Sequence, residues 1–556
     1  MLMCSGTWAQ SSKQNVVWIV CEDISPFIGS YGYVEAQTPN IDELVSEGVR
    51  YTRAYTTAGV CAPSRSAIIT GMYQNSIGTH HMRTIGDPKY QPVPSYSAVI
   101  PEYVKCFPEY LRKAGYYCTN NSKQDYQFEP PVTVWDENGL AASYRNRPEG
   151  SPFFAVFNFA VTHESMIFVR KDSLTADPSS VPVPPYYQDT RTSRTDIARL
   201  ITNIETMDRQ VGELIRDLKS DGVYDNTVIF FYSDHGGALP WMKREILERG
   251  THIPLVIKLA NGAGGGTIDN QLISAVDFAP TVLSLAGIAI PKHLQGQAFL
   301  GKSKASKPRQ YVFAARDRMD TEYDRVRMVR DDQYRYLYNY MPEKPYYQEI
   351  EFRLSVPMMR EMIQLRDEGK LDPVPMRWFS GKPKEELYDV LNDPDELNNL
   401  IDKPAHTKKA DELRTALQQW KDRVGDMGEI PEKEMIATMW GGEDHPPATA
   451  SPKIVKSKNG VKISCDTKGA SIGYQLVSKG SSPREREHSV QSWDFGVLLG
   501  RLKNGDKLPA SQPWKVYDDE EISILPGDTL KVNAMRIGYK PAVIRYCNGE
   551  TIEVRH

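Results

Sequence analysis

The chain has 556 residues, of which 25% are charged and 40% are hydrophobic, and its formal net charge is −4. A chain of this length exceeds what one hydrophobic core can organise, so we expect two or three domains. No basic surplus indicates a nucleic-acid partner, and an anionic ligand would have to meet a local cluster of cations. The sequence holds no run of about 18 apolar residues, so no membrane span is predicted.

The first residues and the cysteines bear on the compartment. Residues 1–12 are weakly apolar and are typical of the remainder of a secretory signal, so we expect a periplasmic or secreted protein. The seven cysteines show no Cys-x-x-Cys spacing, which excludes a disulfide-dense scaffold and a thiolate zinc site. Cys106 could pair with Cys118, and Cys465 with Cys547, but the sequence leaves both pairings open.

Three apolar runs predict buried strands, and each is followed by polar side chains. The runs are 15–21, 153–159 and 227–232, and they are followed by Glu22 and Asp23, by His163, and by Asp234 and His235, respectively. Because the carboxyl ends of parallel strands meet at one edge of a sheet, these side chains should converge. Helical periodicity between the runs completes the pattern of an α/β protein with a mixed or predominantly parallel sheet flanked by helices.

Two helices are indicated by different signals. Thr38 is placed to cap a helix whose first residue is Pro39. Residues 196–220 show the clearest helical periodicity in the chain.

The segment 61–71, Cys-Ala-Pro-Ser-Arg-Ser-Ala-Ile-Ile-Thr-Gly, carries the most specific signal. Pro63 is tolerated in a first helical turn, so we expect a helix that begins at Cys61. Free N–H groups and the helix dipole favour an anion there, and Arg65 adds a permanent cation. The sequence therefore predicts an anion site with a thiol at its centre, against the alternative of an inert buried cysteine.

From about residue 302 the sequence changes to shorter runs rich in Tyr and Arg, and a helix is indicated from about 410 to 424. We divide the chain into a leader, an α/β domain that carries the site, an α+β subdomain with a smaller antiparallel sheet, a linker and an appended β-sandwich. Their ranges are 1–12, 13–301, 302–442, 443–458 and 459–556, respectively. We expect the β-sandwich to pack against the α/β body rather than to bind carbohydrate.

The pattern Cys-x-Pro-x-Arg, running on to Thr-Gly, resembles the activation sequence of the type I, formylglycine-dependent sulfatases. The resemblance covers roughly residues 13–425 and implies an alkaline-phosphatase-like fold. It also implies that a partner, the formylglycine-generating maturation enzyme, oxidises Cys61. The hydrated aldehyde would then be the nucleophile that attacks a sulfate ester.

The resemblance further implies a calcium site made by Glu22, Asp23, Asp234 and His235 together with the modified Cys61. Oxygen ligands suit calcium better than zinc. The family usually shows Asp-Asp and Asp-Asn at these two strand ends. Glu22 keeps a carboxylate, whereas His235 is a larger departure because imidazole is a poor calcium ligand. His235 could contact the sulfate or the diol instead.

Four further residues match positions of the family motif or depart from it. Lys123 and Lys243 match its sulfate-binding lysines, and His163 matches the histidine that protonates the leaving oxygen. Asp125 stands where the family has a histidine, and it could instead hold the diol or substrate, or position Lys123. A solvated Lys-Asp surface pair is the alternative for Lys123 and Asp125.

Two polar clusters are candidate substrate subsites. They are His80, His81 and Arg83, which follow the 61–71 segment, and Arg316 and Arg318 in the second domain. The alternative for each cluster is ordinary solvated surface charge.

The sequence thus predicts a sulfuric ester hydrolase that acts on a sulfated carbohydrate through formylglycine and calcium. One alternative is a phosphatase or phosphonate hydrolase of the same superfamily. The other is a non-catalytic glycan-binding protein in which Cys61 is never modified.

Overall fold

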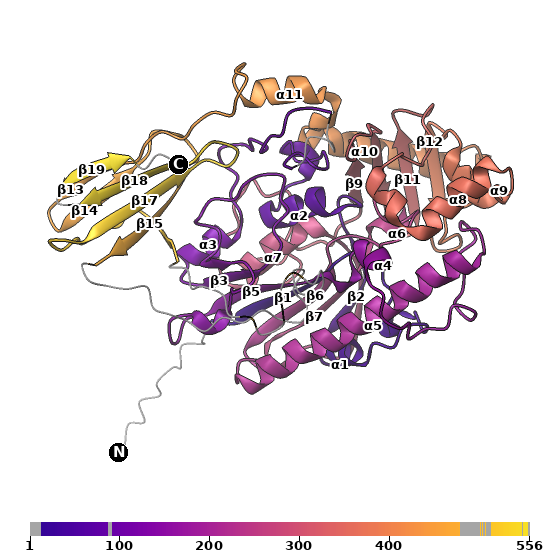
Figure 1. Ribbon diagram of the computed structural model, residues 1–556, viewed down its shortest axis with the longest axis horizontal. Helices are drawn as coiled ribbons and strands as arrows, with labels where there is room; N and C mark the ends of the chain where they lie inside the picture. The colour runs from indigo at the N-terminus through magenta and orange to yellow at the C-terminus, as the bar shows by residue number, and fades with distance from the viewer. Residues whose placement is uncertain are drawn as a thin grey trace.

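The computed structural model describes residues 13–86, 92–478, 513–547 and 549–553, with residues 501, 503 and 506. The predicted leader, residues 1–12, lies outside this part of the chain. The first eight strands are β1 Asn15–Cys21, β2 Val49–Tyr55, β3 Tyr117–Asn121, β4 Glu137–Asn138, β5 Phe153–Phe159, β6 Thr227–Ser233, β7 His252–Lys258 and β8 Thr267–Ser274. They form one sheet in the order β4-β3-β5-β1-β6-β7-β2-β8, at the centre of the ribbon in Figure 1.

The three predicted strands are confirmed, and they lie side by side. β1 pairs in parallel with β5 on one side and with β6 on the other. The register sets Cys21 opposite both Phe159 and Ser233, so the residues that follow the three strands emerge at one edge. β7 is antiparallel to both its neighbours, β6 and β2, which makes the sheet mixed.

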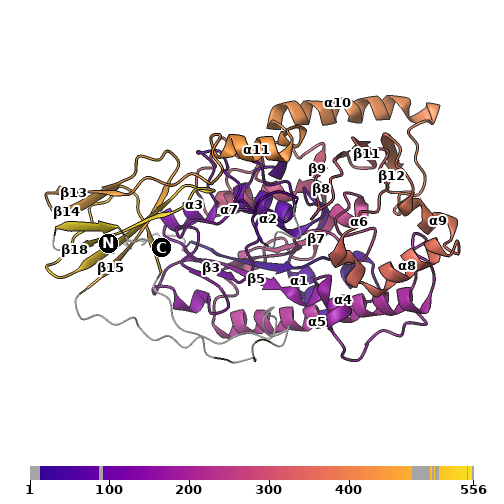
Figure 2. The ribbon, with the colours of Figure 1, turned by 45° about the horizontal axis from the view of Figure 1, so that its top comes forward.

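Both faces of the sheet are buried because side chains alternate along each strand. Val17 and Ile19 of β1 join one apolar cluster, and Val16 and Trp18 join the other. The helices around the sheet are α1 Pro39–Glu47, α2 Cys61–Thr70, α3 Pro108–Lys113, α4 Ser165–Val169, α5 Arg191–Ser220, α6 Glu248–Thr251 and α7 Phe278–Leu285. Figure 2 shows α1, α4 and α5 on one side of the sheet and α2, α3 and α7 on the other.

The predicted helix starts are partly right. α1 begins at Pro39, but the predicted Thr38 cap is wrong, since Thr38 makes no capping hydrogen bond. Its hydroxyl instead accepts from the Gly29 N–H (3.0 Å) and donates to Asp42 Oδ2 (3.3 Å). α5 begins at Arg191, ahead of the predicted periodic segment, where Thr190 Oγ1 accepts from the Ser193 N–H.

The predicted smaller antiparallel sheet is confirmed. Its strands are β9 Val312–Arg316, β10 Val326–Arg330, β11 Tyr334–Asn339 and β12 Glu385–Asp389, in the order β12-β11-β10-β9. The remaining helices are α8 Pro357–Asp367, α9 Pro373–Met376, α10 Thr407–Val424 and α11 Glu432–Met439. α10 packs on this sheet, with the Trp420 ring stacked on Phe313 at 5.0 Å between centroids.

The C-terminal region is a two-sheet β structure at one end of the molecule (Figure 1). Its strands are β13 Lys453–Ser457, β14 Gly460–Ser464, β15 Ser471–Val477, β16 Lys515–Val516, β17 Thr529–Met535, β18 Ala542–Cys547 and β19 Glu550–Glu553. β13 and β14 pair alone, the other five form a second sheet, and β13 lies within the segment predicted as a linker. Leu530 and Val532 share an apolar core with Val461 of β14.

The β structure contacts the α/β domain beside α3. Lys113 Nζ lies 2.6 Å from Asp518 Oδ1, and Lys105 Nζ donates to the Gly469 carbonyl at 2.7 Å.

Neither possible disulfide is formed, because Cys106, Cys118, Cys465 and Cys547 are all free thiols. Within the described residues, no helix has the length and apolar character needed to cross a membrane.

Candidate active site

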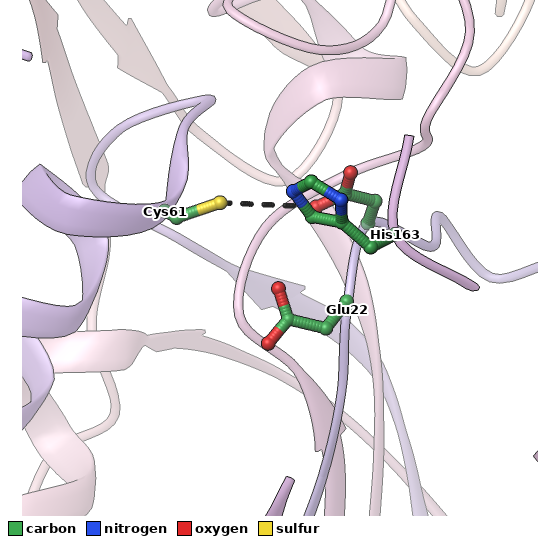
Figure 3. A group of neighbouring side chains, drawn as sticks. Glu22, Cys61 and His163 are labelled. Carbon is green, nitrogen blue, oxygen red and sulfur yellow. Dashed lines mark hydrogen bonds between the residues drawn. The ribbon is translucent and has the colours of Figure 1, made fainter. Parts of the chain in front are cut away.

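The site lies where the start of α2 meets the carboxyl edge of the central sheet. Cys61 is the first residue of α2, as predicted, and only 2% of its surface is exposed. Its Sγ lies 3.2 Å from His235 Nε2 and 3.9 Å from Asp23 Oδ1. The dashed line in Figure 3 starts at this thiol. Figure 3 also shows Glu22 and His163 facing the thiol.

Three carboxylates from two strand ends converge beside the thiol. Glu22 and Asp23 follow β1, Asp234 follows β6, and all three are fully buried. The Asp23 N–H donates to Asp234 Oδ1 at 3.2 Å, which ties the two strand ends together. Buried like charges repel one another, so this arrangement requires cations around it.

Arg65, one turn into α2, supplies the first of these cations. Its Nε donates to Asp234 Oδ2 at 2.9 Å and its Nη2 donates to Glu22 Oε1 at 2.7 Å. Its Nη1 donates to Asn158 Oδ1 at 2.8 Å. The rigid guanidinium fork therefore links the two strand ends through both carboxylates.

Two lysines supply further positive charge at the site. They are the two lysines that match the sulfate-binding positions of the motif. Lys123, shortly after β3, donates to Glu22 Oε2 at 2.6 Å and is 24% exposed toward the cavity. Lys243 is almost fully buried and pairs with Asp23 Oδ2. Each lysine thus contacts a different carboxylate of the β1 end.

A second ion pair supports Lys243. Arg244, its neighbour in the chain, forms a bidentate pair with Glu164, with both N–O distances at 2.8 Å. Glu164 Oε2 also lies 3.8 Å from Lys243 Nζ.

The surrounding charges set the protonation of the carboxylates. Burial alone would raise the pKa of Asp23, but Lys243, His235 and His163 together hold it well below its usual value. Burial likewise opposes ionisation of Asp234, and His235 and Arg65 lower its pKa. For Glu22, burial outweighs Lys123 and Arg65 and raises the pKa.

His235 presents its Nε2 to this group. Its Nδ1–H donates to the Gly236 carbonyl at 2.9 Å, which leaves a lone pair on Nε2 of the neutral ring. Nε2 lies 3.0 Å from Asp23 Oδ1, so two acceptors face each other unless a cation lies between them. A proton can fill this role: burial lowers the pKa of His235, but Asp234 and Asp23 raise it well above its usual value.

The donor set also fits a metal ion. Ligand atoms of Asp23, Cys61, Asp234 and His235 all lie within 4.8 Å of one another, and so do those of Glu22, Asp23, Cys61 and His163. Each group offers two carboxylates, one thiol and one imidazole, and an oxygen in place of the thiol sulfur would make both sets better suited to a hard cation such as calcium. The predicted metal ligands are therefore brought together, and the Nε2 of His235 is aimed at the same point.

His163 follows β5 through the short helix η5 Ala160–Thr162. Its Nδ1 accepts from the Ser165 N–H at 3.2 Å and lies 2.8 Å from Ser165 Oγ, so the neutral ring carries its proton on Nε2. Burial, followed by Lys243 and Lys123, keeps the pKa of His163 well below its usual value despite the nearby Asp23. His163 is thus a neutral hydrogen-bond donor at the cavity wall.

A cavity of about 620 Å³ opens above the thiol. Its lining includes residues singled out from the sequence, namely Glu22, Cys61, Arg83, Lys123, Asp125 and His163. It also includes Asn158, Phe168 and Phe352, which the sequence analysis did not identify. Asn158 could have been found because it occupies the end of a recognised strand, whereas no motif marks the two phenylalanines.

Four of the predicted subsite residues do not line this cavity. His80 and His81 are buried with their rings 4.2 Å apart, below the surface between the two domains. Arg318 is fully buried against Glu432 (2.6 Å), and Arg316 pairs with Glu245 and Asp324. Both arginines are therefore committed to interior ion pairs, which leaves Arg83 as the member of these clusters at the cavity.

The mixed sheet flanked by helices, with a site at the carboxyl edge of its parallel strands, has the alkaline-phosphatase-like fold. A family model described as "Sulfatase" matches residues 14–288, and one described as "N-sulphoglucosamine sulphohydrolase, C-terminal" matches residues 237–352. The chain is 41% identical to an ulvan-active sulfatase of Formosa agariphila, over 95% of this chain and 90% of that protein. The chain therefore belongs to the sulfatase family, and it is a sulfuric ester hydrolase.

Solved structures share the same fold. A 2-O GAG sulfatase matches with a TM-score of 0.54 at 21% identity, over 74% of this chain and 93% of that chain. A phosphonate monoester hydrolase from Silicibacter pomeroyi matches with a TM-score of 0.55 at 17% identity, over 75% of this chain and 96% of that chain. At these identities the likeness concerns the fold alone.

Proposed function

We propose that this sulfatase removes sulfate esters from a sulfated carbohydrate, with formylglycine made from Cys61 as its nucleophilic group and calcium as its metal. The observation that carries the proposal is the position of Cys61 on the cavity floor, with Sγ 3.2 Å from His235 Nε2 and 3.9 Å from Asp23 Oδ1. Hydrated formylglycine would supply a nucleophilic oxygen at this position. A maturation partner, the formylglycine-generating enzyme, would have to act on Cys61 before the helix is buried.

The surrounding cations support charge stabilisation at the sulfate. Lys123 lines the cavity and pairs with Glu22, Lys243 is buried and pairs with Asp23, and Arg65 links the two strand ends through Glu22 and Asp234. Preorganised donors of this kind usually contribute the largest share of catalysis. Attack on sulfur breaks the bond to the leaving oxygen, and that oxygen then needs a proton.

We expect His163 to give that proton. His163 lines the cavity, and the contact of Ser165 with Nδ1 leaves the ring proton on Nε2. Lys243 and Lys123 contribute to its low pKa, and a bound anionic ester would offset both charges. Substrate binding would thereby raise the proton affinity of His163 toward the range useful to a general acid.

Calcium would be held by Glu22, Asp23, Asp234 and His235 together with the oxygen derived from Cys61. When bound, it would neutralise part of the charge of the three carboxylates and of the sulfate. A carbohydrate substrate is supported by the relative named as ulvan-active and by the aromatic side chains at the cavity. Such a substrate agrees with the expected periplasmic or secreted location.

Sulfate release from defined sulfated saccharides tests the proposal. The protein, produced together with a formylglycine-generating enzyme, should release sulfate, and Cys61→Ala and a chelator should each abolish release. A phosphonate monoester measured in parallel addresses the alternative activity. Binding of the saccharides without any sulfate release would instead support a glycan-binding protein.

A further inference from the structure

The cavity above Cys61 is lined by two chemically different sets of side chains. Phe168, Val169 and Phe352 form an apolar wall, whereas Arg83 and Asp125 are charged. A volume of about 620 Å³ lies in the range of sites that enclose small ligands. The cavity therefore suits a ligand with one apolar face and a charged edge.

The apolar wall is built from both domains, and its two aromatic rings contact each other. Phe168 lies on α4, whereas Phe352 lies on the short helix η8 Glu351–Ser355, which follows β11 of the smaller sheet. The two rings meet edge to face, with centroids 5.8 Å apart. The guanidinium of Arg244 lies 6.0 Å from the Phe352 centroid.

Phe352 also stands beside the proposed proton donor. Its ring centroid lies 6.4 Å from that of His163. The leaving alcohol must reach His163, so the group that carries this alcohol passes along the Phe352 ring. A sugar ring has a C–H face that packs on an aromatic face, and its hydroxyls point to the rim.

Arg83 supplies positive charge at the cavity. Its side chain is 44% exposed, and its Nε lies 3.7 Å from Asp320 Oδ1. Lys123 is 24% exposed and is held by Glu22 at 2.6 Å, so Arg83 is the more exposed of the Arg and Lys side chains that line the cavity. A guanidinium fork matches a carboxylate or a sulfate equally well.

The backbone of three charged residues is left-handed, namely Arg83 (φ 62°), Asp125 (φ 55°) and Asp320, the ion-pair partner of Arg83 (φ 50°). Non-glycine residues seldom take this conformation, and it persists where the surrounding structure enforces it, often at ligand sites.

We propose that Phe352 and Arg83 select the sugar unit, with the ring stacked on Phe352 and a second oxyanion of that unit bound by Arg83. The ligand class is a sulfated sugar that carries a second oxyanion, either a uronate carboxylate or another sulfate. This inference rests on the proposed function, because it assumes that a sulfated carbohydrate is cleaved at Cys61.

The test measures kcat and KM for three matched disaccharides and for 4-nitrophenyl sulfate. The first disaccharide carries one sulfate ester and a uronate, the second has the carboxylate reduced to an alcohol, and the third has a second sulfate in place of the carboxylate. The variants are Phe352→Leu, Phe352→Tyr and Arg83→Gln. Tyr103→Ala, at an exposed aromatic residue outside the cavity, is the control.

Phe352→Leu should raise KM for every disaccharide about 2- to 10-fold, because the apolar volume remains but the aromatic face is lost. Phe352→Tyr keeps the aromatic face and should leave KM for the disaccharides close to the wild-type value. The KM for 4-nitrophenyl sulfate should change less than about twofold in both variants, because leucine still packs on the nitrophenyl ring. Arg83→Gln should raise KM about 10- to 100-fold for disaccharides with a second oxyanion and leave the reduced one unchanged. Whichever of these two disaccharides shows the larger increase in KM carries the oxyanion, carboxylate or sulfate, that Arg83 binds.

Unchanged KM values in Phe352→Leu and Arg83→Gln, with wild-type sulfate release intact, would overturn this inference and leave the proposed function standing. Equal KM increases for the acidic and reduced disaccharides in Arg83→Gln would overturn the oxyanion role. No sulfate release by the wild-type protein from any substrate would instead contradict the proposed function.

Discussion

Replacing Arg65 by methionine removes the charge that joins the two carboxylate-bearing strand ends while keeping most of the side-chain volume. Glu22 would retain Lys123 at 2.6 Å, but Asp234 would retain only His235, at 3.8 Å, among its ion-pair partners. Removing one partner of a buried ion pair costs about 3–5 kcal/mol. Because Glu22 stays paired, we expect about 3 kcal/mol, or roughly 5 °C in the melting temperature of the α/β domain.

Differential scanning calorimetry in calcium-free buffer at neutral pH measures this loss without competition from metal. Arg209→Met, at an exposed position of α5, is the matched control and should shift the transition by less than about 1 °C. Adding Asp234→Asn to Arg65→Met should recover part of the loss, since a neutral amide leaves no stranded charge. A loss below about 2 °C, or a double variant that loses the sum of both single effects, would refute this reasoning.

Three further predictions concern the acid, the pH response and the backbone of the site. His163→Gln should slow sulfate release from sugar esters about 10²- to 10⁴-fold, but aryl esters with good leaving groups far less, which steady-state kinetics on both substrates would decide. Burial lowers the pKa of His252 to about 4, and its Nε2–H donates to the Thr52 carbonyl. The unfolded chain therefore binds a proton at His252 before the folded protein does, so the free energy of unfolding should fall by up to about 3 kcal/mol as pH drops from about 6.5 to 4. His252→Gln keeps a donor and should flatten that part of the thermal stability profile, and an identical acid slope in both proteins would contradict the assignment. Gly236→Ala should cost about 1–3 kcal/mol and reduce activity, because the added Cβ would overlap the Arg249 carbonyl, and a variant with unchanged melting temperature and rate would show that the loop can yield.

The central sheet could be predicted because its middle strands are continuous apolar runs, a pattern that local sequence reveals. The helix start at Pro39 followed from the fixed φ of proline, whereas the Thr38 cap did not form. Gly29 and Asp42 engage the Thr38 hydroxyl instead, and this tertiary contact is invisible in the local pattern. Local signals therefore gave the element and missed its hydrogen bonds.

The centre of the site was equally accessible, because Cys61 and Asp234 stand directly at a helix start and a strand end. The outer cavity was not, since Phe352 comes from the second domain and belongs to a short helix without periodicity. Arg318 looked like a substrate ligand in the sequence, but its partner Glu432 lies more than a hundred residues away in the chain. Such a pairing depends on how the domains pack, which spacing alone does not specify.

The state of Cys61 in the active protein tests the central claim most directly. Trypsin should release residues 54–65 as one peptide with Cys61 as its sole cysteine. Oxidation of Cys61 to the formylglycine aldehyde lowers the mass of that peptide by about 18 Da. An aminooxy reagent captures the aldehyde, so its fraction can be measured in preparations made with different amounts of maturation enzyme. Specific sulfatase activity should rise in proportion to the aldehyde fraction from zero, whereas full activity in protein whose Cys61 is entirely a thiol would contradict the account.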